Sequence, residues 1–328
     1  MNRDRDLQAA LDAAAAAMRA VAAVGDPSEL CASDVVWKGA AGPATVADLA
    51  SQVAAVSAIQ GVFGRDGRVV AEESLHEVDQ VGGDELLRRV GSALGASGAC
   101  SDIAHIRESL MSAGDSGGAG RFWAIDPLDG TKGYLRGGQF AIAIALVEEG
   151  APVLGVLAMP RLAAGGTESG TGVISVALAG QGAWQSDAIG GSRLPLRCAP
   201  WKSAGAVRLA ASVERSHSDG DAVTAAIETF APVRPVRVDS QCKYALVARG
   251  DADAYVRLSP DMTYRECIWD HAAGALIAHE AGCEVSDAAG RALDFAAGRR
   301  LERNAGIVCA PPALHRTIAS ALAGTSLG

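Results

Sequence analysis

The sequence has no paired cysteine motif, no long hydrophobic run and no excess of basic residues, and each absence excludes a class of protein. Its seven cysteines are odd in number and scattered, without a C-x-x-C pair, so the sequence indicates neither a disulfide framework nor a zinc knuckle. We interpret them as reduced thiols. No run reaches the ~18 consecutive apolar residues of a membrane span, and the Ala-rich start (13–17) has no signal-peptide cleavage site. We therefore expect a cytoplasmic protein without a membrane partner.

The charge balance argues against a nucleic-acid partner. Lysine and arginine total 29 against 38 aspartates and glutamates, which gives a net charge of -9. Such a surface repels an anionic polymer over most of its area, although a local basic pocket remains compatible with it. With 328 residues, of which 49% are hydrophobic, the chain exceeds the ~250 residues at which single cores stop growing. We expect two domains.

The apolar pattern predicts an α+β domain first. Apolar residues recur at helical spacing in 7–21 and 49–63, and residues 76–110 also favour helices. Three β-rich segments separated by Gly, Glu and Pro follow, at 140–147, 152–159 and 171–184. Such a series predicts an antiparallel meander.

A smaller α/β domain is predicted after it. Strands and helices alternate from about residue 206, with strands expected at 207–212, 236–240 and 254–258 and helices at 222–230 and 243–249. Alternation of this kind is typical of parallel strands. We place the boundary near 195–203, which divides the chain into domains 1–198 and 199–328.

A metal site is predicted where an apolar run stops at Asp126-Pro-Leu-Asp129-Gly-Thr131. Pro127 favours an extended Asp126, so both carboxylates can point to one end of a strand. Two carboxylates held close together repel each other unless a cation lies between them, and hard oxygen ligands favour Mg²⁺. The N-H groups of Gly130 and Thr131 could hold an anion beside the metal. The alternative is an ordinary turn, since turns use the same residues.

Other acids also stand at the ends of predicted elements, each with a structural alternative. Asp48 belongs to a Thr-x-x-Asp pattern that also fits a helix capping box, Glu72 ends a short strand at 67–74, and Asp270 could be the N-cap of a helix at 272–281. With Asp126 and Asp129 counted together, acids stand at four element ends. Such a set matches what a phosphatase with several Mg²⁺ ions needs.

Three motifs carry a resemblance to a known family. They are Ala-Glu72-Glu-Ser, Trp-Ala-Ile-Asp126-Pro-Leu-Asp129-Gly-Thr131-Lys-Gly-Tyr-Leu-Arg-Gly-Gly-Gln-Phe-Ala and Tyr264-Arg-Glu-Cys-Ile-Trp-Asp270-His-Ala-Ala-Gly. With them the chain resembles the lithium-sensitive, magnesium-dependent phosphatases of the inositol monophosphatase superfamily, from about residue 38 to 309. The Lys-Gly-Tyr-Leu-Arg-Gly-Gly-Gln continuation and Asp239-Ser240-Gln-Cys-Lys243-Tyr, downstream of Ser216-His217-Ser218, make it most similar to the 3'(2'),5'-bisphosphate nucleotidases.

The resemblance implies a layered α/β/α/β/α sandwich, two or three Mg²⁺ ions, and removal of the 3'-phosphate of adenosine 3',5'-bisphosphate. The implied metal ligands are Glu72, Asp126, the carbonyl of Leu128, Asp129 and Asp270. Asp48 and Thr131 match the pair that positions and deprotonates the attacking water. The residues that match substrate contacts are Gly130, Thr131, His217, Ser240, Lys243 and Arg257.

The chain departs from the family pattern at a few positions. Relatives tend to carry Asp and Ser where Ala40 and Gly42 stand, in a loop that helps to cover the metal site, and many nucleotidases have Lys at the position of Cys267. These differences bear on a third metal, on lithium sensitivity and on nucleotide affinity.

Alternative functions remain open at this point. One is an inositol phosphate or fructose 1,6-bisphosphate phosphatase of the same superfamily, and another is a non-catalytic nucleotide or metal sensor. A sulfated nucleotide, 3'-phosphoadenosine 5'-phosphosulfate, could be a second substrate. His271 and His279 do not favour zinc, because they are eight residues apart and lack the H-E-x-x-H arrangement.

Overall fold

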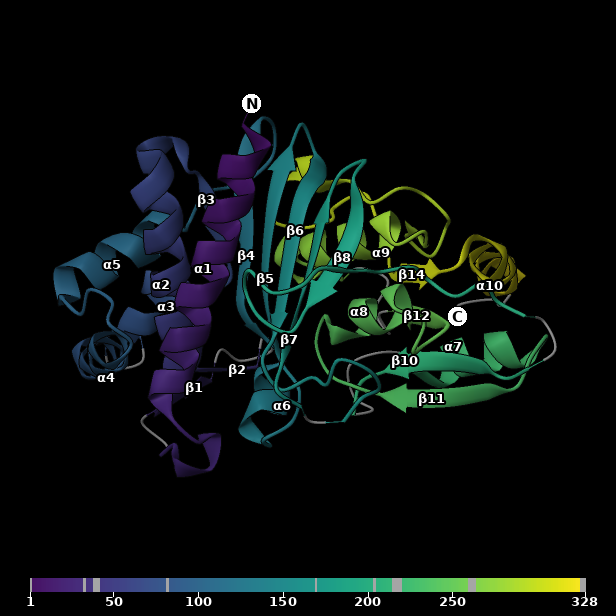
Figure 1. The fold of residues 1–328 in the computed structure, drawn as a ribbon, viewed down its shortest axis with the longest axis horizontal. Coiled ribbons are helices and arrows are strands. Elements are labelled where there is room, and N and C mark those ends of the chain that lie inside the picture. Colours follow the sequence, from purple (N-terminus) through teal and green to yellow (C-terminus); the bar gives the residue numbers. More distant parts are fainter. Residues whose placement is uncertain are drawn as a thin grey trace.

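The computed structural model describes residues 2–31, 34–37, 42–80, 83–168, 170–202, 205–213, 220–258 and 264–324. These residues form stacked layers of helices and sheets (Figure 1). Helices α1 (Arg3–Val24) and α2 (Val46–Phe63) cover one face of a seven-stranded sheet, and α8 (Cys242–Ala248) and α9 (Ala272–Glu280) separate it from a five-stranded sheet. Helices α7 (Gly220–Glu228) and α10 (Pro312–Gly324) cover the far face of the second sheet. This is the predicted α/β/α/β/α sandwich.

The larger sheet follows the order of the chain. Its strands are β3 (Val69–Ala71), β4 (Arg121–Asp129), β5 (Ala141–Glu148), β6 (Ala151–Met159), β7 (Val173–Leu178), β8 (Gly182–Ser186) and β9 (Leu194–Pro195). Strands β3 and β4 are parallel, and every later pair is antiparallel. The predicted meander is therefore confirmed.

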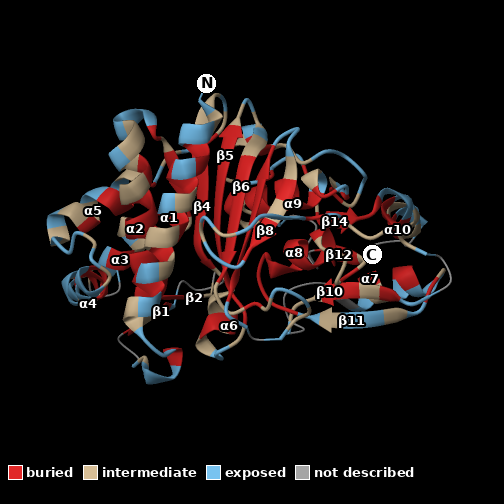
Figure 2. Ribbon diagram, viewed as in Figure 1, coloured by how far each residue is buried: buried red, intermediate tan, exposed pale blue. Residues whose placement is uncertain are grey.

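Successive side chains along the strands of this sheet point to opposite faces and fill two separate cores. Trp123 and Ile125 of β4 lie in the core beneath α1 and α2, whereas Phe122 and Ala124 lie in the core beneath α8 and α9. Both faces of the sheet are covered, which Figure 2 shows as buried central strands flanked by helices with exposed outer faces. Such strands read as continuous apolar runs rather than as an alternating pattern.

Shorter elements complete the first half of the chain. A small sheet pairs β1 (Val35–Trp37) with β2 (Pro43–Thr45). Helices α3 (Leu75–Gln80), α4 (Gly83–Ala96) and α5 (Ile103–Ser112) occupy the segment that was expected to be helical, and α6 (Thr131–Leu135) follows β4. The 3₁₀ turns are Pro27–Glu29, Gly64–Asp66, Ile268–Asp270 and Phe295–Ala297.

The three strands of the alternating segment are parallel, as predicted, and two later strands that pair antiparallel make the second sheet mixed. Its order is β11 (Val233–Arg237), β10 (Val207–Ala211), β12 (Ala254–Arg257), β14 (Ile307–Ala310) and β13 (Glu284–Ser286). Strand β10 is parallel to β11 and β12, but β14 is antiparallel to both of its neighbours. The chain returns from β13 to β14 without a helical crossover, and parallel pairing requires such a crossover. The strand expected at 236–240 lies three residues earlier.

The middle helices tie the two sheets together. A Cβ on Gly155 of β6 would lie 2.8 Å from the carbonyl oxygen of Ala273, and a Cβ on Gly274 would lie 2.3 Å from the Tyr244 ring. Only glycine permits so close an approach. The two sheets lie on either side of residue 198 in the sequence, yet one hydrophobic core joins them through α8 and α9. The division into two domains therefore stays a prediction.

By length and composition alone, two helices of the described chain could cross a membrane, at Arg3–Val24 and Val46–Asp66. Here 44% and 67% of their most apolar windows are buried inside the protein. Ala13 and Ala17 of α1 and Val56 and Ile59 of α2 belong to the core beneath the large sheet. Core packing accounts for their apolar character.

Candidate metal centre and active site

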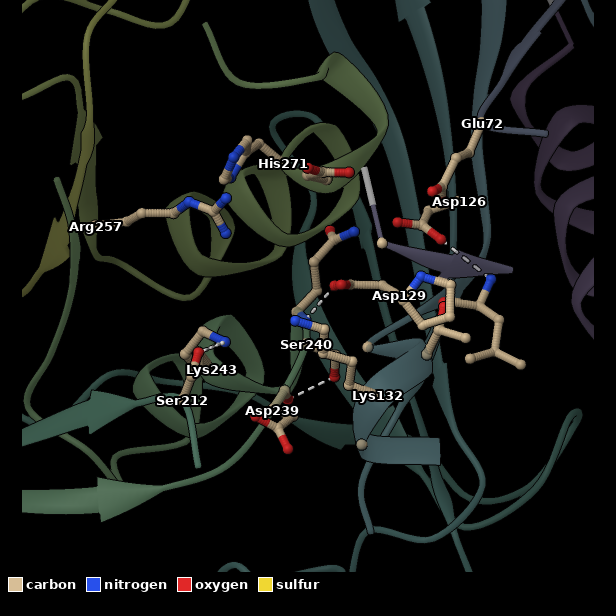
Figure 3. Close-up of a pocket in the computed structure, with 18 of the residues that line it drawn as sticks. Glu72, Asp126, Asp129, Lys132, Ser212, Asp239, Ser240, Lys243, Arg257 and His271 are labelled. Carbon is tan, nitrogen blue, oxygen red and sulfur yellow. Dashed lines mark hydrogen bonds between the residues drawn. The ribbon is translucent and has the colours of Figure 1, made fainter. Parts of the chain in front are cut away.

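Acidic side chains from distant parts of the sequence line one cavity of about 270 Å³. Ala71 pairs with Ile125 in the parallel strands β3 and β4, so the residues that follow them, Glu72 just after β3 and Asp126 within β4, lie side by side. Figure 3 shows their carboxylates pointing toward each other. Asp270, at the end of the 3₁₀ turn before α9, lines the same cavity.

Three residues at the end of β4 could offer oxygen ligands to a metal. The register of β4 and β5 shifts between Asp126 and Asp129, and Asp126 Oδ1 accepts a hydrogen bond from the Leu128 N-H at 3.1 Å. Asp126, Leu128 and Asp129 all line the cavity. The segment is thus the irregular end of strand β4 rather than the ordinary turn of the alternative interpretation, and its acids line the cavity.

The charges of these acids oppose one another. Burial raises the pKa of Asp126 well above its ordinary value, and repulsion from Glu72, Asp129 and Asp270 raises it further. Burial likewise raises the pKa of Asp270 and, against the attraction of Lys243, raises the pKa of Asp129 to about 6. Hard divalent cations prefer carboxylate and carbonyl oxygens, so these residues fit a metal that would offset the repulsion.

Asp48 takes part in both of the roles considered for it. Its Oδ2 accepts hydrogen bonds from the Thr45 N-H at 2.8 Å and the Thr45 hydroxyl at 2.6 Å, which completes the capping box of α2. Its Oδ1 accepts a hydrogen bond from the Thr131 hydroxyl at 2.9 Å. Thr131 lines the cavity, so the buried Asp48 reaches the site through it.

Helix α2 also holds the ends of the two strands that carry the candidate metal ligands, which the sequence did not reveal. The Ser51 hydroxyl donates to the carbonyl of Pro127 at 2.6 Å. The Gln52 side chain donates to the carbonyl of Glu73 at 2.7 Å and accepts from its N-H at 2.9 Å. Both are buried polar groups that satisfy backbone at strand ends. Their side chains fix the turns that carry Glu72 and Asp126.

The candidate substrate residues occupy the other side of the cavity. Gly130 has a φ of 90°, and a Cβ added to it would lie 3.1 Å from the Cβ of Ser240. Ser240 also has a positive φ, of 64°. Lys243 and Arg257 line the cavity across from Glu72 and Asp126 (Figure 3). The lysine Nζ donates to the Ser212 hydroxyl at 3.3 Å. His217 and Ala40 lie outside the described residues.

Gln241 was also missed, although it connects the two halves of the site. Its N-H donates to Asp129 Oδ2, its side-chain amide donates to the Trp269 carbonyl at 2.9 Å, and its Oε1 accepts from the Gly274 N-H at 3.1 Å. One glutamine thereby links β4 to the segment that carries Asp270. Beside it, Arg136 forms an ion pair with Asp239 at 2.6 Å.

The alternative role of Asp270, as the N-cap of α9, is not formed. His271 precedes α9 at the N-cap position, and no side-chain cap is formed there. The 3₁₀ turn ends at Asp270, so the chain reaches the helix one residue later. His271 is buried and lies beside Glu266 and Tyr244. Glu266, Asp270 and His271 form a group compact enough for a metal ion, but the first and last of them are engaged in other hydrogen bonds.

The chain is similar to known proteins over most of its length. The family model described as "Inositol monophosphatase family" matches residues 2–326. This chain belongs to the inositol monophosphatase family. Among curated members, it is 36% identical over 291 residues to a 3'(2'),5'-bisphosphate nucleotidase of Oryza sativa, which covers 83% of this chain and 80% of the relative. It is 35% identical over 326 residues to a protein of the same name from Emericella nidulans, with 89% and 90% covered.

Solved structures of this family share the fold. The extragenic suppressor protein suhB of Bartonella henselae superposes with a TM-score of 0.64 at 20% identity, covering 98% of both chains. CysQ of Bacteroides thetaiotaomicron superposes with a TM-score of 0.57 at 23% identity, covering 93% of this chain and 97% of the other. These neighbours confirm the predicted architecture.

Proposed function

We propose that this protein is a Mg²⁺-dependent phosphomonoesterase that removes the 3'-phosphate of adenosine 3',5'-bisphosphate and releases AMP and phosphate. The observation that carries the proposal is the division of one cavity into two sides, with Glu72 and Asp126 on one and Lys243 and Arg257 on the other. The acids suit metal ions and a scissile phosphate. The cations suit a second phosphate in a protein of negative net charge. Relatives named 3'(2'),5'-bisphosphate nucleotidase support this substrate class.

We assign the metal ions to the acidic side. Two or three Mg²⁺ ions would be held by Glu72, Asp126, the Leu128 carbonyl, Asp129 and Asp270. When bound, Mg²⁺ would supply the Lewis-acid activation of water and the charge neutralisation that phosphoester hydrolysis requires.

Asp48 and Thr131 form the proton acceptor for the attacking water. The Thr131 hydroxyl donates its proton to Asp48 Oδ1, so its oxygen lone pairs are free to accept a hydrogen bond from water in the cavity. As that water attacks phosphorus, its proton passes to the Thr131 oxygen while the threonine proton moves to Asp48. Because Asp48 is buried and fixed by Thr45, it is held in place for this transfer.

The remaining residues orient the substrate. The N-H groups of Gly130 and Thr131 would donate to the scissile phosphate, and the positive φ of Gly130 turns the chain there. Ser240, Lys243, Arg257 and His217 would contact the nucleotide and its second phosphate. The attacking water and the leaving 3'-oxygen then lie on opposite sides of phosphorus, as in-line displacement requires.

A phosphate-release panel tests the substrate. Adenosine 3',5'-bisphosphate, 3'-phosphoadenosine 5'-phosphosulfate, inositol 1-phosphate and fructose 1,6-bisphosphate are compared with Mg²⁺ and with EDTA. The proposal expects the highest kcat/KM for adenosine 3',5'-bisphosphate and no release with EDTA. A preference for inositol 1-phosphate or fructose 1,6-bisphosphate would favour the alternative phosphatases, and binding without release would favour a sensor.

The basic side is tested separately. Replacing Lys243 or Arg257 with Ala should raise KM for the bisphosphate nucleotide far more than KM for inositol 1-phosphate. Equal increases in KM for both substrates would refute the assignment of Lys243 and Arg257 to the second phosphate.

A further inference from the structure

Arg257 is held in the cavity wall by a carboxylate to which neither the sequence motifs nor the proposed reaction assigns a role. Glu266 is 3% exposed, and its Oε1 accepts a hydrogen bond from Arg257 Nε at 2.8 Å. The bond joins β12 to the segment that precedes Asp270. Arg257 itself lines the cavity, and Figure 3 shows its guanidinium reaching inward from the basic side.

The second oxygen of Glu266 is also engaged. Its Oε2 lies 3.4 Å from His271 Nε2, and His271 Nδ1 lies 2.9 Å from the Tyr244 hydroxyl. A carboxylate only accepts, so the imidazole donates through Nε2 and its Nδ1 accepts the tyrosine O-H. Three elements, β12, α8 and the start of α9, are thereby fixed around one carboxylate.

The backbone beneath Glu266 is anchored as well. The Leu301 N-H donates to the Glu266 carbonyl at 2.9 Å, and the Ile268 N-H donates to the Arg299 carbonyl at 3.1 Å. The carboxylate therefore stands on a supported segment rather than on a free loop. A guanidinium bound through Nε to such a support has a fixed plane, which suits the bidentate geometry of phosphate recognition.

The ion pair between Arg257 and Glu266 also explains why a buried guanidinium stays charged. Burial alone would lower the pKa of Arg257, but Glu266 and Tyr255 raise it well above its ordinary value. A buried ion pair seldom adds net stability compared with apolar residues of similar size. A gain in stability alone therefore does not account well for Glu266 at this position. Holding the Arg257 guanidinium at the cavity wall does account for it. By comparison, the Lys243 ammonium group donates to the Ser212 hydroxyl and lies over the Tyr255 ring, which are both uncharged groups.

We propose that Glu266 is a positioning residue, which holds the Arg257 guanidinium in the orientation that receives the second phosphate of a nucleotide bisphosphate. The inference rests on the proposed function, because it requires a substrate with a phosphate beyond the scissile one. It adds a determinant of specificity that acts through Arg257 and does not touch the substrate.

The test compares two substrates that differ in the second phosphate alone, adenosine 3',5'-bisphosphate and adenosine 3'-phosphate. Initial rates give kcat and KM for the wild type, Glu266→Ala, Glu266→Gln, Arg257→Ala and the double variant Glu266→Ala/Arg257→Ala. Glu302→Ala is the matched control, because Glu302 is an exposed acid of the same region. Thermal unfolding of each variant reports on stability.

Glu266→Ala should raise KM for the bisphosphate at least about tenfold and leave KM for adenosine 3'-phosphate within about twofold, since Arg257 loses its charged support and would contact the second phosphate only. Glu266→Gln keeps an acceptor oxygen for Arg257 Nε, so its KM should rise in the same direction but less. In the Arg257→Ala background, Glu266→Ala should add nothing further to KM. Glu302→Ala should match the wild type.

Two results would overturn the inference, and they are distinguishable. A wild type that does not prefer the bisphosphate over adenosine 3'-phosphate would overturn the proposed substrate and this role together. A wild type with that preference, combined with Glu266 variants that change both substrates equally or that worsen Arg257→Ala, would overturn the positioning role alone. If Glu266→Ala fails to fold, Glu266→Gln decides by the same ratio of KM values.

Discussion

The Thr131 hydroxyl donates to Asp48 Oδ1 at 2.9 Å while Asp48 Oδ2 caps helix α2. One carboxylate thus fixes the start of a helix and reaches the cavity through a threonine. The sequence offered these as competing interpretations, and the geometry accommodates both because the two oxygens face different partners.

Replacing Asp48 with Asn should therefore separate catalysis from stability. The amide oxygen can still accept hydrogen bonds from Thr45, but it no longer accepts a proton. We expect kcat to fall by about 10²–10⁴-fold with a small change in Tm. Thr45→Ala is the matched control, since it removes the Thr45 side-chain contacts and costs about 1 kcal/mol of stability while leaving the Thr131 contact in place. Steady-state kinetics and thermal unfolding check both, and an Asp48→Asn enzyme of normal kcat would refute the proton-acceptor role.

Replacing Asp126 with Asn should have opposite effects on activity and on metal-free stability. Burial and repulsion from Glu72, Asp129 and Asp270 raise the pKa of Asp126, so the neutral amide removes an unfavourable charge. We expect Tm in EDTA to rise, Mg²⁺ to stop raising it, and phosphate release to disappear. Differential scanning fluorimetry with and without Mg²⁺ measures the first two effects. Near-normal hydrolysis by Asp126→Asn would refute the metal assignment.

The stabilisation by Mg²⁺ should depend on pH. Without metal, burial raises the pKa of Asp129 to about 6, and burial raises the pKa values of Asp126 and Asp270 too. A group with a raised folded pKa binds protons more tightly when folded, so its contribution to stability is lost as pH rises through that value. Mg²⁺ needs the ionised acids and competes with these protons. The gain in Tm on adding Mg²⁺ should be larger at about pH 8 than at about pH 5.5. An equal gain at both values would contradict the site.

The sequence predicted the acids of the site because each stands at the end of an element, where local patterns are legible. It could not show that Glu72 and Asp126 lie side by side, since register between β3 and β4 depends on pairing across about fifty residues. The alternative of an N-cap role for Asp270 failed for a related reason. Whether the helix begins at residue 271 or 272 depends on the 3₁₀ turn before it, which has no distinct sequence pattern.

The supporting residues were harder to predict than the acids. The partners of Gln241 lie 28, 33 and 112 residues away in sequence, and those of Glu266 lie five and nine residues away, in each case on separate elements. Buried glutamine and glutamate are uncommon enough that their presence in a core signals a specific partner, yet burial itself is not visible in a chain this rich in alanine. The meander and the alternation that follows it were predictable because they are patterns of whole elements, whereas the layered sandwich was expected from the family resemblance.

Replacing Gly130 with Ala tests whether the turn after β4 must approach the second half of the site. Gly130 has φ of 90°, and an added Cβ would lie 3.1 Å from Ser240 Cβ. The neighbouring Gly137 has φ of 73° with nothing within 4 Å of its Cβ. Both alanines carry the backbone cost of about 1 kcal/mol for the left-handed region, but only Gly130→Ala also presses Ser240 away. We expect Gly137→Ala to lower Tm slightly and keep full activity, whereas Gly130→Ala should lower Tm further and reduce kcat/KM by about tenfold or more, as a displacement of about 1 Å at a site can do. Unfolding curves and initial rates of the two variants decide, because equal activity in both would mean that the closeness of Gly130 to Ser240 has no part in catalysis.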